Sequence, residues 1–336
     1  MAAWVCLNGE LVPEEQARVS VFDSGFMQGI GLFETMRTYG GRVFRLDEHL
    51  ARLLTSAQRL GWAVLPDSDV LIEHVDRVIA AAHSDEDLRV RLTVTTGSLH
   101  YQARPEPALT IVATATPGVS YPAELYAKGA TVALSPYRQG THDPTTGHKT
   151  TSYFARLASL REAHAKRALE ALWFTSDGHL AEGAISNVFV VAAGQLLTPP
   201  LDTPVLPGIT REVVLEIAKQ LGIGAVEQPL TLDDVFAAEE LLLTNALMEV
   251  MPVVRIERRP VGNEKPGPVF AELLGAYREL AEQECARGDA VDDDDAIDAG
   301  AGDVALFGGA DAAGHEESAV DHEEDAADDE DADGDE

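Results

Sequence analysis

Charge is distributed very unevenly along this 336-residue chain, and this limits the part of the chain that can fold. Of the 57 acidic residues, 21 lie from Asp289 onward, where the sequence holds no lysine or arginine. A segment so rich in Asp, Glu, Ala and Gly cannot bury enough apolar surface to offset the entropy lost on ordering. We therefore expect a disordered, non-catalytic acidic tail over residues 289–336 and a folded body over residues 1–288.

The composition is typical of a globular protein that buries a full core. The hydrophobic fraction is 45%, and the length fits about two domains. No stretch approaches the roughly 18 apolar residues of a membrane span, and the start of the chain lacks the features of a signal peptide. The two cysteines, Cys6 and Cys285, predict no disulfide framework and favour a reducing cytoplasm.

The balance of charged residues favours a high-salt environment and gives no sign of a nucleic-acid partner. Lysine is scarce, at five residues against 20 arginines, and the net charge is −32. This balance suits a high-salt cytoplasm, where repulsion between like charges is screened. The alternative is an acidic mesophilic protein with an interaction tail. No basic cluster points to nucleic acid.

Hydrophobic periodicity predicts an α/β (α+β) fold. In residues 1–125 we expect a small α/β sandwich. Its hairpins and strands are expected over residues 4–12, 32–46, 88–96 and 108–116, and its helices over 47–61 and 70–79. In residues 126–288 we expect strands over 171–175, 188–192, 240–244 and 252–256, with helices over 153–168, 209–221 and 269–286. In the strand over residues 88–96, alternation places Arg89 and Arg91 opposite the apolar face.

Two segments of the second half carry an amine and a carboxylate. Lys149 lies within His148-Lys149-Thr150-Thr151-Ser152-Tyr153, and Glu182 follows 33 positions later. An amine that forms a Schiff base and an acid that holds a pyridinium nitrogen are the two groups that pyridoxal phosphate chemistry needs. Taken alone, the position of Lys149 in a polar loop favours a solvated surface group, and Glu182 is compatible with a surface acid beside a turn glycine.

Other residues suit the binding of anions. Gly208-Ile209-Thr210 opens a helix, where free N–H groups and the helix dipole attract a phosphate, although a Pro-Gly turn before a capped helix has the same sequence. Arg52 offers a permanent bidentate cation, or else faces solvent. Arg91 binds a substrate carboxylate if its strand face lines a pocket. The histidines and cysteines do not have the spacing of metal ligands. The sequence also contains no glycine-rich dinucleotide-binding loop.

Taken in order, these segments resemble the class IV aminotransferase family of fold type IV pyridoxal phosphate enzymes. The resemblance covers roughly residues 4–285 and includes Phe22–Gly25, Gly31–Arg37, Glu48–Leu53, His148–Thr150, Glu182–Asn187 and Leu206–Arg211. It implies pyridoxal 5′-phosphate as cofactor, a larger C-terminal domain with a mixed, β-barrel-like sheet, and a homodimer with its active site between the domains.

The resemblance also implies roles for particular residues. Lys149 would form the Schiff base, and Glu182 would bind the ring nitrogen. The other cofactor-binding residues would be Arg52, Tyr153, Ser186, Asn187, Gly208, Ile209, Thr210, Asn245 and Ala246, with Tyr153 at the phenolic oxygen. Arg91 would bind the carboxylate of a small-molecule amine substrate.

Within the family, the chain resembles aminodeoxychorismate lyases most. Transaminases of this fold tend to place a small hydroxyl residue three positions before the residue that corresponds to Glu249, where this chain has Ala246. The run Asn245–Val253 and the segment Leu134–Arg138 are similar to the lyases. We therefore expect a 4-amino-4-deoxychorismate lyase that forms 4-aminobenzoate and pyruvate. The alternatives are a branched-chain or D-amino acid aminotransferase and, from another class, a non-enzymatic acidic partner protein.

Overall fold

Two β-sheets organise the part of the chain that the computed structural model describes, which comprises residues 4–98, 108–118 and 121–287. The first sheet has six strands in the order β2-β1-β6-β5-β3-β4, and every neighbouring pair is antiparallel. Its strands are β1 (Trp4–Leu7), β2 (Glu10–Pro13), β3 (Gly31–Tyr39), β4 (Arg42–Val43), β5 (Leu88–Thr95) and β6 (Thr110–Pro117).

The tight turns of this sheet follow from the residues at their tips. Asn8 and Gly9 both have positive φ, at 50° and 85°, between β1 and β2. Gly40 and Gly41 repeat this arrangement between β3 and β4, at 59° and 87°. Two consecutive left-handed residues are what a type I′ hairpin requires. Both predicted hairpins are confirmed.

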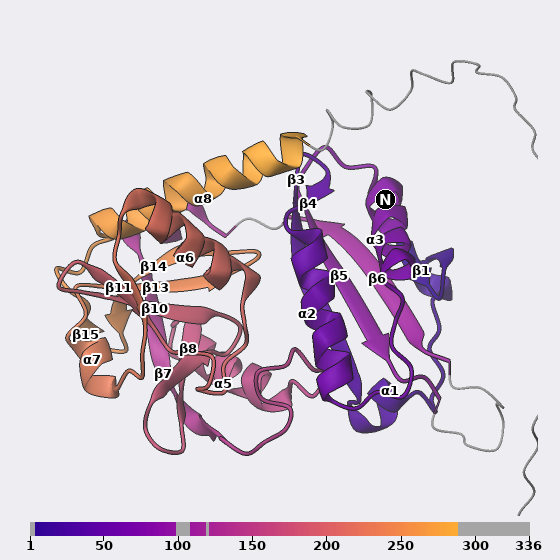
Figure 1. Cartoon of the computed structure of the whole chain (residues 1–336), viewed down its shortest axis with the longest axis horizontal. Helices are drawn as coiled ribbons and strands as arrows, with labels where there is room; N and C mark the ends of the chain where they lie inside the picture. Colours follow the sequence, from indigo (N-terminus) through magenta and orange to yellow (C-terminus); the bar gives the residue numbers. More distant parts are fainter. Residues whose placement is uncertain (1–3, 99–107, 119–120, 288–336) are drawn as a thin grey trace, which may run out of the picture. The chain divides into compact units, whose positions relative to one another are not determined.

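Two helices cover one face of the first sheet. They are α2 (Leu46–Arg59) and α3 (Ser68–Ala82), drawn beside the sheet in Figure 1. The alternate residues Leu88, Val90, Leu92 and Val94 of β5 pack against them in one apolar cluster. Because side chains alternate across a strand, Arg89 and Arg91 lie on the opposite face, as the sequence predicted.

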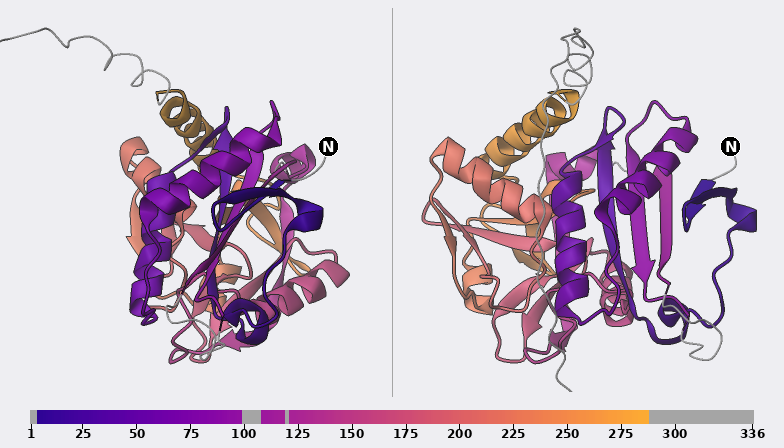
Figure 2. Two further views of the ribbon diagram at one scale, coloured as in Figure 1. Left: turned by 90° about the vertical axis from the view of Figure 1, so that its right-hand side faces the viewer. Right: turned by 45° about the vertical axis from the view of Figure 1, so that its right-hand side comes forward.

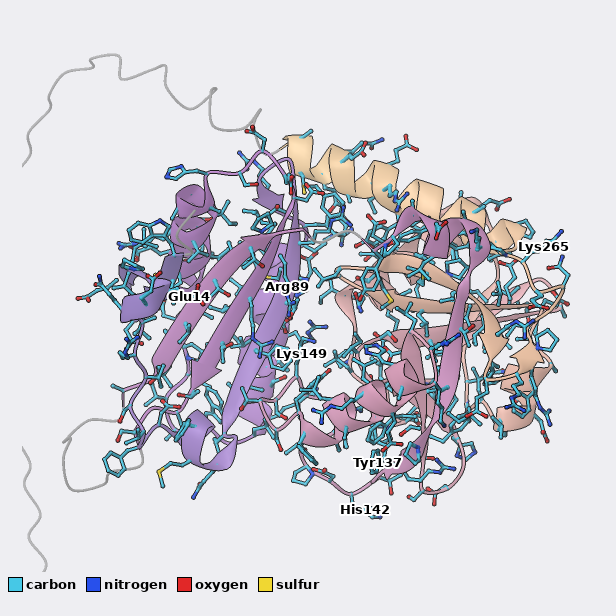
Figure 3. All side chains as sticks on the ribbon, turned by 180° about the vertical axis from the view of Figure 1, so that it is seen from behind. Glu14, Arg89, Tyr137, His142, Lys149 and Lys265 are labelled. Atoms are coloured by element: carbon cyan, nitrogen blue, oxygen red, sulfur yellow. The ribbon has the colours of Figure 1, made fainter. Side chains whose placement is uncertain are left out.

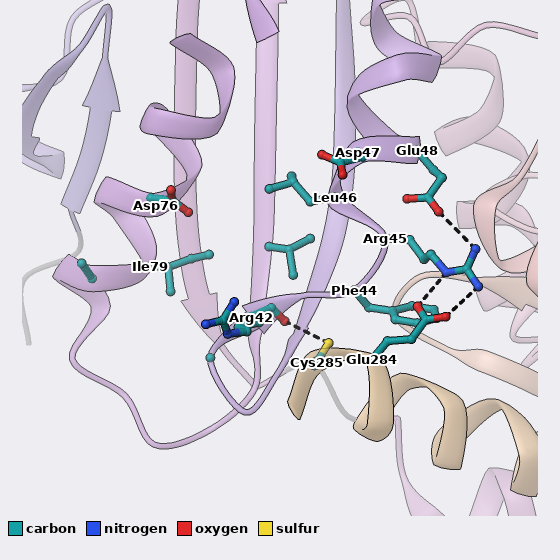
Figure 4. A pocket seen from close by; sticks show the side chains of 13 residues that line it. Arg42, Phe44, Arg45, Leu46, Asp47, Glu48, Asp76, Ile79, Glu284 and Cys285 are labelled. Carbon is teal, nitrogen blue, oxygen red and sulfur yellow. Dashed lines mark hydrogen bonds and ion pairs between the residues drawn. The ribbon is translucent and has the colours of Figure 1, made fainter. Parts of the chain in front are cut away.

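Helix α2 begins at Leu46, one residue earlier than expected. The N-cap is Arg45, in the left-handed conformation with φ 56°, and it makes no side-chain cap. Its guanidinium instead forms ion pairs with Glu48 of α2, Glu216 of α6 (Ile209–Leu221) and Glu284 of α8 (Pro268–Arg287). Figure 4 shows the pairs with Glu48 and Glu284. These long-range ion pairs hold Arg45 in place, and local propensity does not anticipate them.

The second sheet has nine strands and is mixed. Its order is β12-β11-β10-β13-β14-β7-β8-β9, and β15 also pairs with β14. The pairs β7–β8, β7–β14 and β11–β12 are parallel. The strands are β7 (Ala130–Gln139), β8 (Glu170–Thr175), β9 (Leu180–Gly183), β10 (Asn187–Ala192), β11 (Gln195–Thr198), β12 (Ala225–Glu227), β13 (Glu240–Asn245), β14 (Glu249–Ile256) and β15 (Arg259–Pro260). The sheet curls enough for β9 to contact β10, which confirms the mixed, barrel-like sheet.

Helices cover the second sheet from more than one side. Helices α6 and α8 share an apolar cluster with β10, β13 and β14, and α5 packs on β7 and β8. The end of α8 reaches β3 of the first sheet (Figures 1 and 2). The remaining helices are α1 (Ser24–Gln28), α4 (Ala123–Lys128), α5 (Phe154–Ala165), α6 (Ile209–Leu221), α7 (Leu232–Phe236) and α8 (Pro268–Arg287), with one short 3-10 turn (Glu14–Gln16).

The expected division of the body at residue 125 stays a prediction. The first sheet ends before that residue and the second begins after it, but all described residues belong to one compact unit. The acidic tail expected over residues 289–336 lies outside the described residues. Among the described residues, no helix has the length and apolarity to cross a membrane.

A buried carboxylate joins the two sheets and α8. Glu249, 1% exposed, has a left-handed backbone with φ 58° at the start of β14. It accepts hydrogen bonds from Arg37 Nη1 at 3.0 Å and the Tyr39 hydroxyl at 3.1 Å, both on β3, and from Arg278 Nε on α8 at 2.7 Å. A carboxylate in this position is favourable only while its cations stay in place.

We expect Glu249→Ala to lower the free energy of unfolding by about 3–5 kcal/mol, since the buried partners lose their acceptor. Urea denaturation measures this quantity. Glu282→Ala, at an exposed position of α8, is the matched control and should change the value by less than about 0.5 kcal/mol. If the two variants lose equally little stability, Glu249 does not join these elements.

Candidate active site

The lysine singled out in the sequence lies in an extended segment beside β3. The Phe33 N–H donates to the Lys149 carbonyl at 2.9 Å, and the Thr151 N–H donates to the Gly31 carbonyl at 2.8 Å. A side chain at residue 31 would meet Thr151 Oγ1 at 2.9 Å, so glycine permits the close approach. Lys149 is thus fixed by the first sheet, in the region between the two sheets (Figure 3).

The Lys149 amine is desolvated and surrounded by charge. Its Nζ lies 4.6 Å from the centroid of the Phe33 ring. Burial, together with the nearby guanidiniums of Arg52 and Arg91, lowers the pKa of Lys149 to about 8, against the opposing effect of Glu34 and Glu182. A pKa near 8 leaves a usable fraction of the neutral amine, which is the nucleophilic and basic form, at neutral pH.

Glu182 lies on β9 and lines the same cavity as Lys149, which measures about 700 Å³. Its Oε1 accepts from Arg156 Nη2 at 2.6 Å, and its Oε2 accepts from the Leu206 N–H at 3.0 Å. The carboxylate is nearly buried. The amine and the acid that the sequence pairs are therefore brought together in one cavity.

One end of the cavity is suited to an anion. Helix α6 starts at Ile209, directly after Gly208, and no side chain caps it. Arg52 of α2 donates from Nη1 to the carbonyl of Pro207 at 2.9 Å, which places its guanidinium beside the start of α6. Unpaired N–H groups, the positive end of the helix dipole and a fixed cation together form an anion site.

Arg52 is held by a buried acid that the sequence did not single out. Glu34 of β3 accepts from Arg52 Nε at 2.9 Å and Nη2 at 2.5 Å, and its Oε2 lies 2.8 Å from His49 Nδ1. Burial alone would raise the pKa of Glu34, but Arg52 and His49 hold it at about 2. An acid on the helix-facing side of an otherwise apolar strand was the signal available in the sequence.

The turn after β13 also lines the cavity. Asn245 Oδ1 accepts from the N–H groups of Leu247 at 2.9 Å and Met248 at 2.8 Å. Its Nδ2 donates to the carbonyl of Ile185 at 3.0 Å. Thr244 Oγ1, also at the cavity wall, is buried without a hydrogen-bond partner in the described part of the chain. That hydroxyl is a polar group suited to a ligand.

Two predicted cofactor residues use their side chains to support the site. Ser186 Oγ donates to Glu170 Oε2 at 2.9 Å, and Asn187 Nδ2 donates to the Leu206 carbonyl at 2.9 Å. The wholly buried Glu170 also accepts from the N–H groups of Ala184 and Ile185. The polar side-chain groups of Ser186 and Asn187 therefore fix the loop after β9.

Tyr153 and Arg91 both contact the ring of Phe33, which lines the cavity. The Tyr153 ring packs edge-on against Phe33 at 5.4 Å, and its hydroxyl donates to the Ala184 carbonyl at 3.1 Å. Burial raises the pKa of Tyr153, so the hydroxyl keeps its proton. The Arg91 guanidinium stacks 3.9 Å from the Phe33 centroid, and burial and Arg89 lower its pKa.

The cavity brings every predicted site residue together. Its lining includes Arg52, Arg91, Lys149, Tyr153, Glu182, Ser186, Asn187, Gly208, Ile209, Thr210, Asn245 and Ala246. Sequence reasoning missed other residues of this region, because each looks like an ordinary charged or polar residue until its partners are known. These are Glu34, His49, Arg89, Arg138, Gln139, Arg156 and Glu170.

The geometry agrees with comparisons to known proteins. Residues 31–256 match the family model described as Amino-transferase class IV. This chain belongs to the class IV aminotransferase family. A putative branched-chain-amino-acid aminotransferase of Methanocaldococcus jannaschii is 34% identical over 82% of this chain and 96% of the relative. An aminodeoxychorismate lyase of Bacillus subtilis is 30% identical over 82% of this chain and 93% of the relative.

Solved structures share the fold of this class IV chain. The branched-chain amino acid aminotransferase of Escherichia coli superposes with a TM-score of 0.78 at 29% identity, covering 84% of this chain and 96% of that one. A second branched-chain amino acid aminotransferase, also 29% identical with a TM-score of 0.78, was solved with pyridoxamine 5′-phosphate. Membership of this family makes the chain an enzyme, with the two-domain α/β fold that the sequence predicted.

The lowered pKa of Lys149 can be measured directly. In the cofactor-free protein, the rate of reductive methylation of Lys149, plotted against pH, should have its midpoint near pH 8. An exposed lysine has its midpoint at about pH 10.4. Peptide mass spectrometry measures the extent at each lysine, so the other four serve as internal comparison. A midpoint for Lys149 above about pH 10 would contradict a desolvated amine.

Proposed function

We propose that this class IV enzyme binds pyridoxal 5′-phosphate with Lys149 as the attachment point. The observation that carries this is a single cavity lined by a lysine amine, a carboxylate and the uncapped start of a helix. These are the groups that the cofactor's aldehyde, ring nitrogen and phosphate require. The family match and the relative solved with pyridoxamine 5′-phosphate support it.

The residues of the cavity fit each part of the cofactor. Arg52, the first N–H groups of α6 and the Thr210 hydroxyl would hold the phosphate, and the buried Thr244 hydroxyl without a partner supplies another donor. Glu182 would accept from the ring nitrogen through a lone pair that Arg156 and Leu206 leave free. Tyr153 would donate to the phenolic oxygen.

Pyridoxal 5′-phosphate, when bound, supplies an aldehyde that condenses with amines and a protonated ring that withdraws electrons. Lys149 Nζ would then take the proton from the substrate carbon that bears nitrogen, which a pKa of about 8 suits. In a lyase the enolpyruvyl C–O bond breaks next, and the Lys149 ammonium would return a proton to the departing enol carbon, giving pyruvate.

Within the family, we propose 4-amino-4-deoxychorismate lyase. Three arginines, Arg89, Arg91 and Arg138, line the cavity and form no ion pair with a carboxylate among the described residues. Arginine binds carboxylates in bidentate fashion, and aminodeoxychorismate carries two of them. Ala246 at the closing turn and the 30% identical lyase also support this assignment.

An aminotransferase is the second candidate. It is favoured by the putative branched-chain aminotransferase that is 34% identical and by the branched-chain aminotransferases that share the fold. An aminotransferase also accepts a dicarboxylic oxo acid, and the same arginines suit that co-substrate. The two reactions are distinguished by their products, which are 4-aminobenzoate and pyruvate for the lyase and an amino group transferred to an oxo acid for the aminotransferase.

Purified protein should convert aminodeoxychorismate to 4-aminobenzoate without added oxo acid, measured by the fluorescence of the product after chromatography. Lys149→Ala should lower the rate by at least about 1,000-fold, because the proton acceptor is lost. Arg161→Met, an exposed change on α5, is the control and should keep the rate. Transfer of amino groups from leucine to 2-oxoglutarate, with no 4-aminobenzoate formed, would assign the aminotransferase instead.

We also propose that the enzyme acts as a homodimer. An exposed apolar set flanks the contact between Gly29 and the lysine segment, where Thr151 Oγ1 donates to the Gly29 carbonyl at 2.7 Å. Its members include Phe26, 74% exposed, and Phe154, 83% exposed, with Val21, Met27, Ile30 and Leu157. Large exposed apolar groups clustered in this way are typical of an interface.

Light scattering after size exclusion should give twice the monomer mass for the native chain. Phe26→Asp with Phe154→Asp should give the monomer mass, because two charges would be desolvated at the interface. Leu221→Asp is the control, since Leu221 is exposed at the end of α6 and should leave the mass unchanged. A native chain that elutes as a monomer at micromolar concentration argues against the dimer.

A further inference from the structure

The carboxylate of Glu182 is fixed by partners from two different segments. Arg156 of α5 donates to Oε1 at 2.6 Å, and the Leu206 N–H donates to Oε2 at 3.0 Å. Two donors on two oxygens define the plane of a carboxylate. Each oxygen retains a lone pair for a further donor. The acid is therefore oriented before any ligand arrives.

Arg156 is itself held on several sides. Its Nη1 donates to the Gly183 carbonyl at 2.9 Å, and its Nη2 donates to Gln139 Oε1 at 2.6 Å as well as to Glu182. Its guanidinium stacks 4.5 Å from the centroid of the Trp173 ring. The planar group thus joins the residue after Glu182, the end of β7 and an aromatic ring of β8 at once.

The orientation of the Gln139 amide is set by its hydrogen bond with Arg156. Arginine only donates, so the oxygen of the Gln139 amide must face Arg156. Its Nε2 then points away, and within the described ranges it is buried without a hydrogen-bond partner. An unsatisfied buried amide is unfavourable, and the hydrogen bond from Arg156 to the Gln139 oxygen offsets that cost.

We infer that Arg156 is a positioning residue, which orients the Glu182 carboxylate toward the ring nitrogen of the cofactor. The inference rests on the role proposed above for Glu182. Arg156 does not contact the reacting atoms; it acts through the acid. A lysine would keep the charge, but a single ammonium cannot reach the carboxylate, the Gly183 carbonyl and the Gln139 oxygen with the same planar geometry.

The test compares two cofactors that differ at one atom. Pyridoxal 5′-phosphate and its 1-deaza analogue, in which carbon replaces the ring nitrogen, have the same phosphate and aldehyde. Dissociation constants of both are measured by absorbance titration for the native protein, Arg156→Met, Arg156→Lys and Arg161→Met. Arg161 lies on the same helix, is exposed and has no ion pair within the described residues, so Arg161→Met is the matched control.

Arg156→Met should weaken binding of pyridoxal 5′-phosphate by roughly tenfold, because a charge-assisted hydrogen bond to the ring nitrogen is misaligned. The same change should weaken binding of the 1-deaza analogue by less than about threefold, since that ligand has no ring nitrogen to lose. Arg156→Lys should also weaken binding of pyridoxal 5′-phosphate more than binding of the 1-deaza analogue, but by a smaller factor. If circular dichroism shows that Arg156→Met is unfolded, Arg156→Lys takes its place in the comparison.

Equal losses for the two cofactors would mean that Arg156 only supports the fold, and the inference would be overturned. Tighter binding of pyridoxal 5′-phosphate by Arg156→Met would overturn it too, because the guanidinium would then compete with the ring nitrogen for the acid. Failure of the proposed function has a different signature, in which the native protein binds neither cofactor at Lys149.

Discussion

The rest of the site depends on the removal of one amine from water. The Lys149 amine is desolvated over the Phe33 ring, and its neighbours include two guanidiniums and two carboxylates. Burial disfavours the ammonium form, and the opposing charges limit the effect, so that the pKa falls to about 8 rather than lower. Each neighbour must therefore be held at a fixed distance, and the surrounding structure provides this. Glu34 is paired with Arg52, and Glu182 is paired with Arg156.

Two sheets supply the groups, and buried ion pairs keep the sheets together. The first sheet carries Phe33, Arg91 and the lysine segment, while the second carries Glu182 and the turn after β13. Glu249 joins β3 to β14 and α8 directly behind that turn. An ion cluster buried in this way adds little net stability compared with apolar packing, but it is costly to break. It suits a position where orientation matters more than stability.

The sequence predicted residues that a local sequence pattern marks, and it missed residues whose role depends on a partner distant in the sequence. Helix α6 was predicted with its observed ends, because Gly208 and Gly222 bound an amphipathic stripe and Gly222 adopts the left-handed conformation. Strand β9, which carries Glu182, was missed because its four residues are all buried and show no alternation. Arg156 looks like an ordinary helix-surface arginine. Its pairing with Glu182 crosses 26 positions of sequence, and no local pattern encodes it.

The most direct test of the account is a crystal structure of the protein grown with pyridoxal 5′-phosphate. The account predicts continuous electron density from Lys149 Nζ to the cofactor. The phosphate should lie against Arg52 and the start of α6, and a Glu182 oxygen should lie within hydrogen-bonding distance of the ring nitrogen. Density for the cofactor on any other lysine, or a phosphate bound away from α6, would contradict it.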